Sequence, residues 1–63
     1  MKKEEANHLL EHWIEHNESH SKSFRDRAKQ VREISPEAAK AIEEAAEIMD
    51  QSTLSLRKAK EVL

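Results

Sequence analysis

Four histidines are the residues of this sequence whose type and spacing best suit chemistry. They recur every four residues, at His8, His12, His16 and His20, and the chain has no others. Histidines four apart share one face of a helix, and neutral imidazoles placed in this way bind Zn²⁺, Ni²⁺, Co²⁺ or Cu²⁺. Each step of four also turns by ~40° around a helix, so all four side chains cannot reach one ion. The spacing therefore predicts a metal site built on an adjacent pair, with further ligands from elsewhere.

The second half of the chain offers one acidic candidate for such a site. We expect a polar layer at the middle of the folded chain, made of His16, Asn17 and His20 against Asp50, Ser52 and Thr53. His16 and His20 with Asp50, or with the same pair of a second copy, would give a tetrahedral set. The predicted metal ligands are His12, His16, His20 and Asp50, with Zn²⁺, Ni²⁺ or Co²⁺ as the ion.

Two alternatives to metal binding stay open for this polar layer. A layer of polar side chains in a helical bundle can fix the helix register and the number of copies without holding any ligand. The chain would then be a protein-interaction or assembly module. Imidazole also titrates close to neutral pH, so the layer can act as a pH switch.

Few residues are suited to catalysis. The chain has neither cysteine nor glycine, which excludes a thiol nucleophile, a disulfide and a glycine-rich phosphate loop. Di-iron carboxylate bundles need several Glu-x-x-His pairs, and only Glu5 with His8 has that spacing. We therefore expect no enzymatic activity.

The sequence Ser35-Pro36-Glu37 is the one strong interruption of an otherwise helical pattern. Serine is a favoured N-cap, proline is favoured at the first helical position, and glutamate suits the positive end of the helix dipole. The sequence therefore predicts two helices, at about 4–33 and 36–62. An alternative with three helices would place a further break near residues 19–23, where serines cluster.

Each predicted helix carries a seam of apolar and semi-polar residues at alternating steps of four and three, which is typical of packed helices. The first seam is Ala6, Leu10, Trp13, Asn17, His20, Phe24, Ala28, Val31 and Ile34. The second seam is Ala38, Ile42, Ala45, Met49, Ser52, Leu56, Ala59 and Leu63. Trp13 is predicted to be a core or interface anchor, because aromatic side chains dominate burial in bundles.

Charged residues alternate in blocks that favour an antiparallel hairpin. Residues 4–18 and 33–50 are mainly acidic, whereas residues 22–32 and 57–60 are mainly basic. Folding the chain at Ser35 sets an acidic block against a basic block twice. A hairpin leaves part of each seam uncovered, so two hairpins are expected to pack as a homodimeric four-helix bundle.

The length and composition allow one small domain, residues 1–63. A chain of this size buries too little surface for a robust core of its own, so self-association or a metal is expected to add stability. The net charge is −2, and the basic block has acidic residues to neutralise it, so we expect no nucleic-acid partner. We find no membrane span and no secretory signal, and we expect a cytoplasmic protein with itself, or another protein, as partner.

The segment from Trp13 to His20 resembles a Trp-x-x-His-Asn-x-x-His signature of small, poorly characterised prokaryotic helical-hairpin domains. The likeness covers the first predicted helix, and the second is similar only as an Ala- and Glu-rich helix. The resemblance implies a helical hairpin and a metal-related role.

Overall fold

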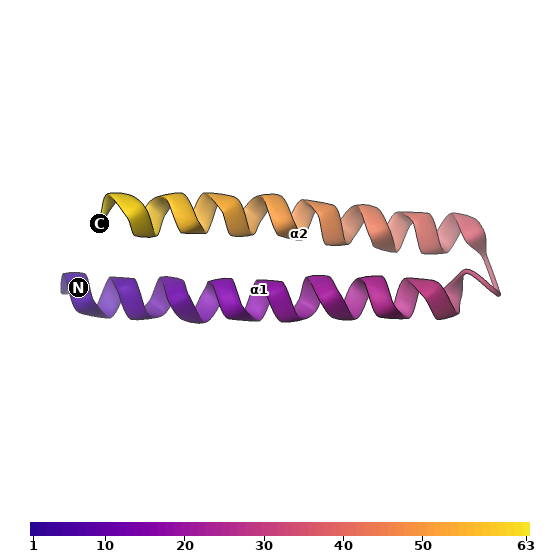
Figure 1. Ribbon diagram of the computed structural model, residues 1–63, viewed down its shortest axis with the longest axis horizontal. Coiled ribbons are helices and arrows are strands. Elements are labelled where there is room, and N and C mark those ends of the chain that lie inside the picture. The colour runs from indigo at the N-terminus through magenta and orange to yellow at the C-terminus, as the bar shows by residue number, and fades with distance from the viewer.

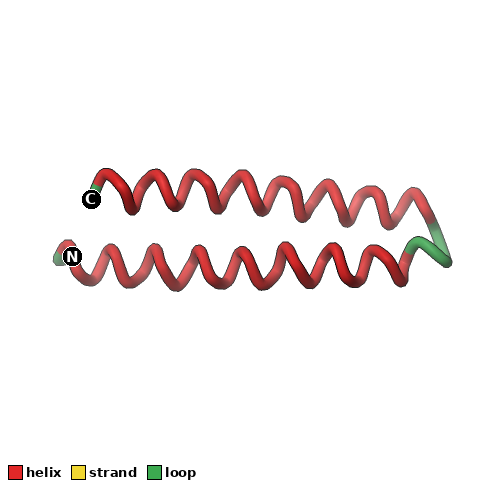
Figure 2. Tube along the Cα trace, in the orientation of Figure 1, coloured by secondary structure: helices red, strands yellow, loops and turns green.

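The computed structural model describes all 63 residues as two long helices, α1 (Lys3–Val31) and α2 (Pro36–Val62). The helices lie side by side and run in opposite directions, so both chain ends lie at the same end of the molecule (Figure 1). Only the chain ends and the turn at residues 32–35 are non-helical (Figure 2). The predicted all-α antiparallel hairpin is confirmed, and α1 ends two residues before its predicted boundary.

The turn forms as the sequence predicts. Ser35 has an extended backbone, and its hydroxyl oxygen accepts a hydrogen bond from the backbone N–H of Ala38 at 3.1 Å. Pro36 is the first residue of α2 and has no N–H to leave unsatisfied. Helix α1 continues without interruption through residues 19–23, so the three-helix alternative is wrong.

The buried residues form a single line on each helix, which we call the buried line. They recur at seven-residue steps, as Ile14, Ser21 and Ala28 on α1 and Ala39, Ala46 and Thr53 on α2. Most of them have small side chains, and no large side chain is fully buried. The predicted seams are therefore wrong at alternate positions, because the hairpin interface uses the residues next to Trp13, His20, Ala38, Ala45 and Ser52 instead. Small side chains allow two helices to approach closely, and counting apolar residues does not reveal such a line.

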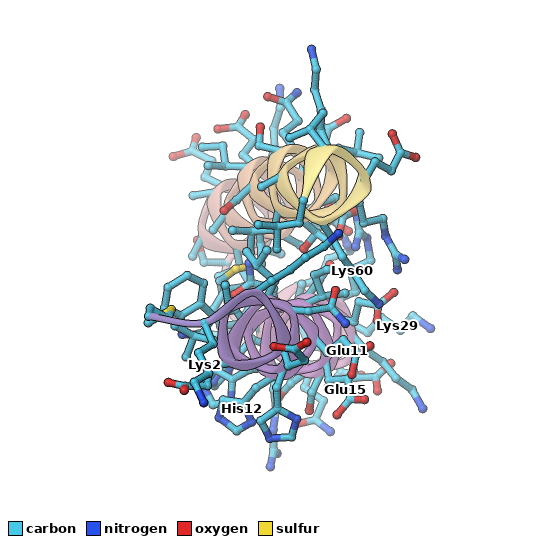
Figure 3. All side chains as sticks on the ribbon, turned by 90° about the vertical axis from the view of Figure 1, so that its left-hand side faces the viewer. Lys2, Glu11, His12, Glu15, Lys29 and Lys60 are labelled. Atoms are coloured by element: carbon cyan, nitrogen blue, oxygen red, sulfur yellow. The ribbon has the colours of Figure 1, made fainter.

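Four ion pairs join the helices along one side of the buried line, and we call them the ion-pair ladder. They are Glu11–Lys60 (2.8 Å), Glu18–Arg57 (2.6 Å), Arg25–Asp50 (2.8 Å) and Arg32–Glu43 (2.6 Å). Viewed along the hairpin, Glu11 and Lys60 lie on the same side of the molecule (Figure 3). The pairing confirms the antiparallel match of acidic with basic blocks. Because the side chains are roughly half exposed, solvent screens each pair, and the ladder fixes the alignment of the helices more than it adds stability.

The opposite side of the buried line is mainly apolar, and Asn17 and Ser52 are its polar interruptions. Most ladder positions directly follow an apolar residue, as Arg25 follows Phe24 and Asp50 follows Met49. Consecutive helical residues point ~100° apart, so the two sets lie on opposite flanks of the buried line. We call this side the apolar face: Leu10, Trp13, Phe24 and Val31 of α1 with Ala38, Ile42, Ala45, Met49, Leu56 and Ala59 of α2.

The apolar face has no partner within the chain. Trp13 is 44% exposed, Ala38 and Ala45 are exposed, and most other members of the face are only half-buried. All of its members belong to the two predicted seams. Neither helix contains a stretch long and apolar enough to cross a membrane.

Candidate functional site

All four histidines are exposed on α1. His16 and His20 lie on the side away from the ion-pair ladder, whereas His8 lies near the ladder residue Glu11. The four-residue spacing shifts each histidine by ~40° around the helix axis. His20, seven residues after Trp13, lies at the edge of the apolar face. His12 points away from α2 into solvent (Figure 3).

The last two histidines converge on each other. Nε2 of His16 lies 3.0 Å from Nε2 of His20, and the ring centroids are 4.4 Å apart. A tetrahedral ion with Zn–N bonds of about 2.0–2.1 Å holds two nitrogens about 3.3–3.4 Å apart. The two nitrogens are therefore already within a few tenths of an ångström of the separation that a chelated metal requires. His12 is less closely associated, with its ring centroid 6.2 Å from that of His16.

The structure does not bring Asp50 to this pair. Oδ2 of Asp50 accepts a hydrogen bond from Nη2 of Arg25 at 2.8 Å, and Oδ1 accepts one from the Ser21 hydroxyl at 2.5 Å. Asp50 belongs to the ion-pair ladder, whereas His16 and His20 lie on the other side of α1. No group of three or more His, Asp or Glu side chains is close enough to hold one ion. The predicted set with Asp50 is therefore not assembled within one chain, because Arg25 is within reach of Asp50 and His20 is not.

Ser21 and Arg25 are structural residues that the sequence analysis missed. The buried Ser21 hydroxyl lies 3.4 Å from the backbone oxygen of Ala46 and accepts a hydrogen bond from Nη1 of Arg25 at 2.5 Å. Hydrogen bonds from Arg25 and Ser21 hold the pKa of Asp50 below its usual value. Asp50 in turn raises the pKa of Arg25. The signal in the sequence was the seven-residue repeat of charges at Glu11, Glu18, Arg25 and Arg32.

The rest of the predicted polar layer is only partly buried. Thr53 is buried and its hydroxyl donates to the backbone oxygen of Met49 at 3.0 Å. Asn17 is half-buried and Ser52 is exposed. The hollows in the surface are lined mainly by polar and charged side chains, and no histidine lines any of them. The His16–His20 pair therefore lies on an open surface beside the apolar face.

Comparison with known proteins identifies relatives but no assigned activity. The family model for a domain of unknown function, DUF8180, matches residues 6–63. An uncharacterized protein of Archaeoglobus fulgidus is 39% identical over 56 residues, which is 89% of this chain and 90% of the relative. No solved structure matches the chain.

Proposed function

We propose that this chain, which belongs to the DUF8180 family, is a small assembly module that pairs with a second copy of itself through its apolar face. The two hairpins would form a four-helix bundle. The observation that carries the proposal is the division of the hairpin into two sides. One side is closed by the ion-pair ladder, and the other leaves apolar side chains half-buried or exposed along both helices.

The energetics of one hairpin favour a partner. Only six residues are buried, and the apolar ones are Ile14 and three alanines. A helix is stabilised mainly by burial of its apolar stripe, and chains of this size often gain that burial by association. The hairpin leaves its larger side chains, such as Phe24, Met49 and Leu56, half-exposed.

A second copy of the hairpin matches the apolar face in length and in spacing. An identical hairpin offers a face of the same length and the same seven-residue period, as an isologous dimer requires. The hairpin is 48 Å long and 14 Å wide. The area of one such face is of the order of the ~800 Å² that each partner buries in a standard interface. The proposal also includes a cytoplasmic location and assigns neither a catalytic role nor a nucleic-acid partner.

Sedimentation velocity over a range of concentrations tests the proposal. Ala45 is exposed on the apolar face, and Leu54 is exposed on the other flank of α2. We expect the wild type to be a dimer at micromolar concentration and A45E to be a helical monomer. L54E adds the same charge elsewhere and should dimerise like the wild type. A wild-type monomer with a melting temperature that does not depend on concentration would overturn the proposal.

The convergence of His16 and His20 favours a second candidate function, the binding of a divalent transition metal. The Nε2 atoms of these two exposed histidines lie 3.0 Å apart, at hydrogen-bond distance from each other, which is close to the separation of two nitrogen ligands on one ion. Calorimetric titration with Zn²⁺, Ni²⁺ and Co²⁺ tests it. We expect H16A/H20A to lose the binding signal and the single variant H8A to keep it. An unchanged titration of H16A/H20A would exclude the pair as the site.

A further inference from the structure

A metal ion held by His16 and His20 would need further ligands. Two imidazoles occupy only two positions of a tetrahedral ion, whose structural sites have four protein ligands. The chain itself supplies no third His, Asp or Glu within reach of the pair. Asp50 is already held by Arg25 and Ser21. Additional protein ligands must therefore come from another chain.

The pair is placed where a second copy would cover it. His20 lies at the edge of the apolar face, with its ring centroid 6.0 Å from that of Phe24. His16 lies one turn earlier, and its Nε2 points at His20. A dimer formed through the apolar face would therefore bring the partner's helices close to both imidazoles.

The pair also lies at the middle of the hairpin. Helix α1 runs from residue 3 to residue 31, so His16 and His20 bracket its midpoint. If the two hairpins point in opposite directions, a dyad through their middle sets α1 antiparallel to α1 of the second copy. Residues 16–20 then meet their own counterparts across the dyad. If both turns lie at the same end, α1 packs on the partner's α2 instead, and the two pairs are separated.

We propose that His16 and His20 of two copies bind one divalent transition ion together, with four imidazoles at the dyad of an opposite-end dimer. This inference rests on the proposed dimer. The ion is Zn²⁺, Ni²⁺ or Co²⁺, which accept imidazole ligands. Because the complete site exists only in the dimer, metal binding and dimerisation strengthen each other by the same factor.

Sedimentation equilibrium with and without Zn²⁺, combined with metal analysis of the dimer fraction, measures this coupling. We expect one Zn²⁺ per two chains and a dimer dissociation constant lowered by about tenfold or more, a typical size for linkage between two binding events. H16A/H20A should have the dimer dissociation constant of the metal-free wild type, and adding Zn²⁺ should not change it. H8A should respond like the wild type. Bound Co²⁺ should show the intense visible absorption of a tetrahedral site.

The direction of the hairpins gives an independent readout. The chain has no cysteine, and Ile34 in the turn is 87% exposed, so I34C can carry a single spin label at the turn. In the opposite-end dimer the two labels are separated by about the 48 Å length of the hairpin. A short distance between labels would show that both turns lie at the same end and would overturn the shared site.

The remaining outcomes separate the two proposals. One Zn²⁺ per chain with an unchanged dimer constant would overturn the shared site but leave the dimer and the chelating pair intact. A dimer that binds no Zn²⁺ would overturn the site and leave the assembly module. A chain that stays monomeric with or without Zn²⁺ would overturn both the dimer and the shared site.

Discussion

The hydroxyl of Ser21 donates a hydrogen bond to Oδ1 of Asp50 at 2.5 Å, and this bond ties the buried line of α1 to the ion-pair ladder. Ser21 is the only polar residue on the buried line of α1. It also accepts a hydrogen bond from Arg25, so one hydroxyl joins both members of an ion pair. A buried hydroxyl needs such partners, because an unsatisfied polar group is costly inside a protein.

Replacing this hydroxyl should destabilise the hairpin measurably. S21A removes the hydrogen bonds of a buried group, for a net loss of about 0.5–1.5 kcal/mol. A loss of 1 kcal/mol lowers the melting temperature of a small domain by about 4–8 °C. S23A is the matched control, because Ser23 is exposed on the same helix and the substitution changes helix propensity equally. Thermal unfolding followed by circular dichroism compares the two, and equal melting temperatures would show that the Ser21 bonds do not stabilise the fold.

The neighbouring alanines Ala45 and Ala46 should respond oppositely to the same substitution. Ala46 is fully buried between the helices and Ala45 is exposed on the apolar face. Overpacking a close helix contact costs about 1–3 kcal/mol, so A46L should lower the free energy of unfolding by that amount. A45L adds apolar area to the face that is proposed to dimerise, so it should tighten the dimer. Denaturant unfolding and sedimentation measure the two effects. A tolerated A46L would contradict the close approach at this position.

The contrast between buried Ala46 and exposed Ala45 also shows which parts of the fold could be predicted from the sequence. The helices, the turn at Ser35 and the antiparallel pairing follow from capping, proline and charge blocks, and all were predicted. Of the six buried residues, only Ala28 belongs to a predicted seam. The others were missed because each helix has adjacent seven-residue lines with the same helical spacing. Counting large apolar residues selects the line with Trp13 and Leu56, whereas the hairpin closes on the line with Ser21 and Ala46.

For the candidate site, the sequence predicted that neighbouring histidines lie together but not where Asp50 lies. The four-residue spacing correctly indicates that neighbouring histidines share a face, and His16 and His20 do converge. The position of Asp50 depends on which flank of α2 faces the charged side of α1. That choice is set by the ladder, in which Asp50 belongs with Arg25. The sequence analysis matched Asp50 with His16 and His20 by their position along the hairpin. That position does not show on which flank of each helix a side chain lies.

The ion-pair ladder should make the stability depend on pH in acid. The Lys60 ammonium holds the pKa of Glu11 below its usual value, as Arg25 and Ser21 do for Asp50. A carboxyl with a lowered pKa in the folded state stabilises the fold above its unfolded pKa of about 4, and this contribution is lost as the pH falls through the folded pKa. The melting temperature should therefore fall below about pH 4–5.

The variant D50N isolates one part of this acid dependence. It should be less stable than the wild type at neutral pH, and the difference should shrink as the pH falls. D26N is the control, because Asp26 is exposed and forms no ion pair with any residue of the ladder. Melting curves from pH 7 down into acid provide the measurement. A D50N deficit that stays constant at all pH values would mean that the charge of Asp50 does not stabilise the hairpin.

Trp13 should report directly on which face of the hairpin dimerises. It is the only tryptophan of the chain and is 44% exposed on the apolar face. Covering an indole side chain shifts its fluorescence to shorter wavelength, because the ring is removed from water. Dilution of the wild type should therefore shift the emission to longer wavelength as the dimer dissociates. A45E should show the long-wavelength emission at every concentration, and L54E should follow the wild type. If sedimentation shows dissociation while the emission stays constant, the dimer uses a face that does not include Trp13, and the shared histidine site would fall with it.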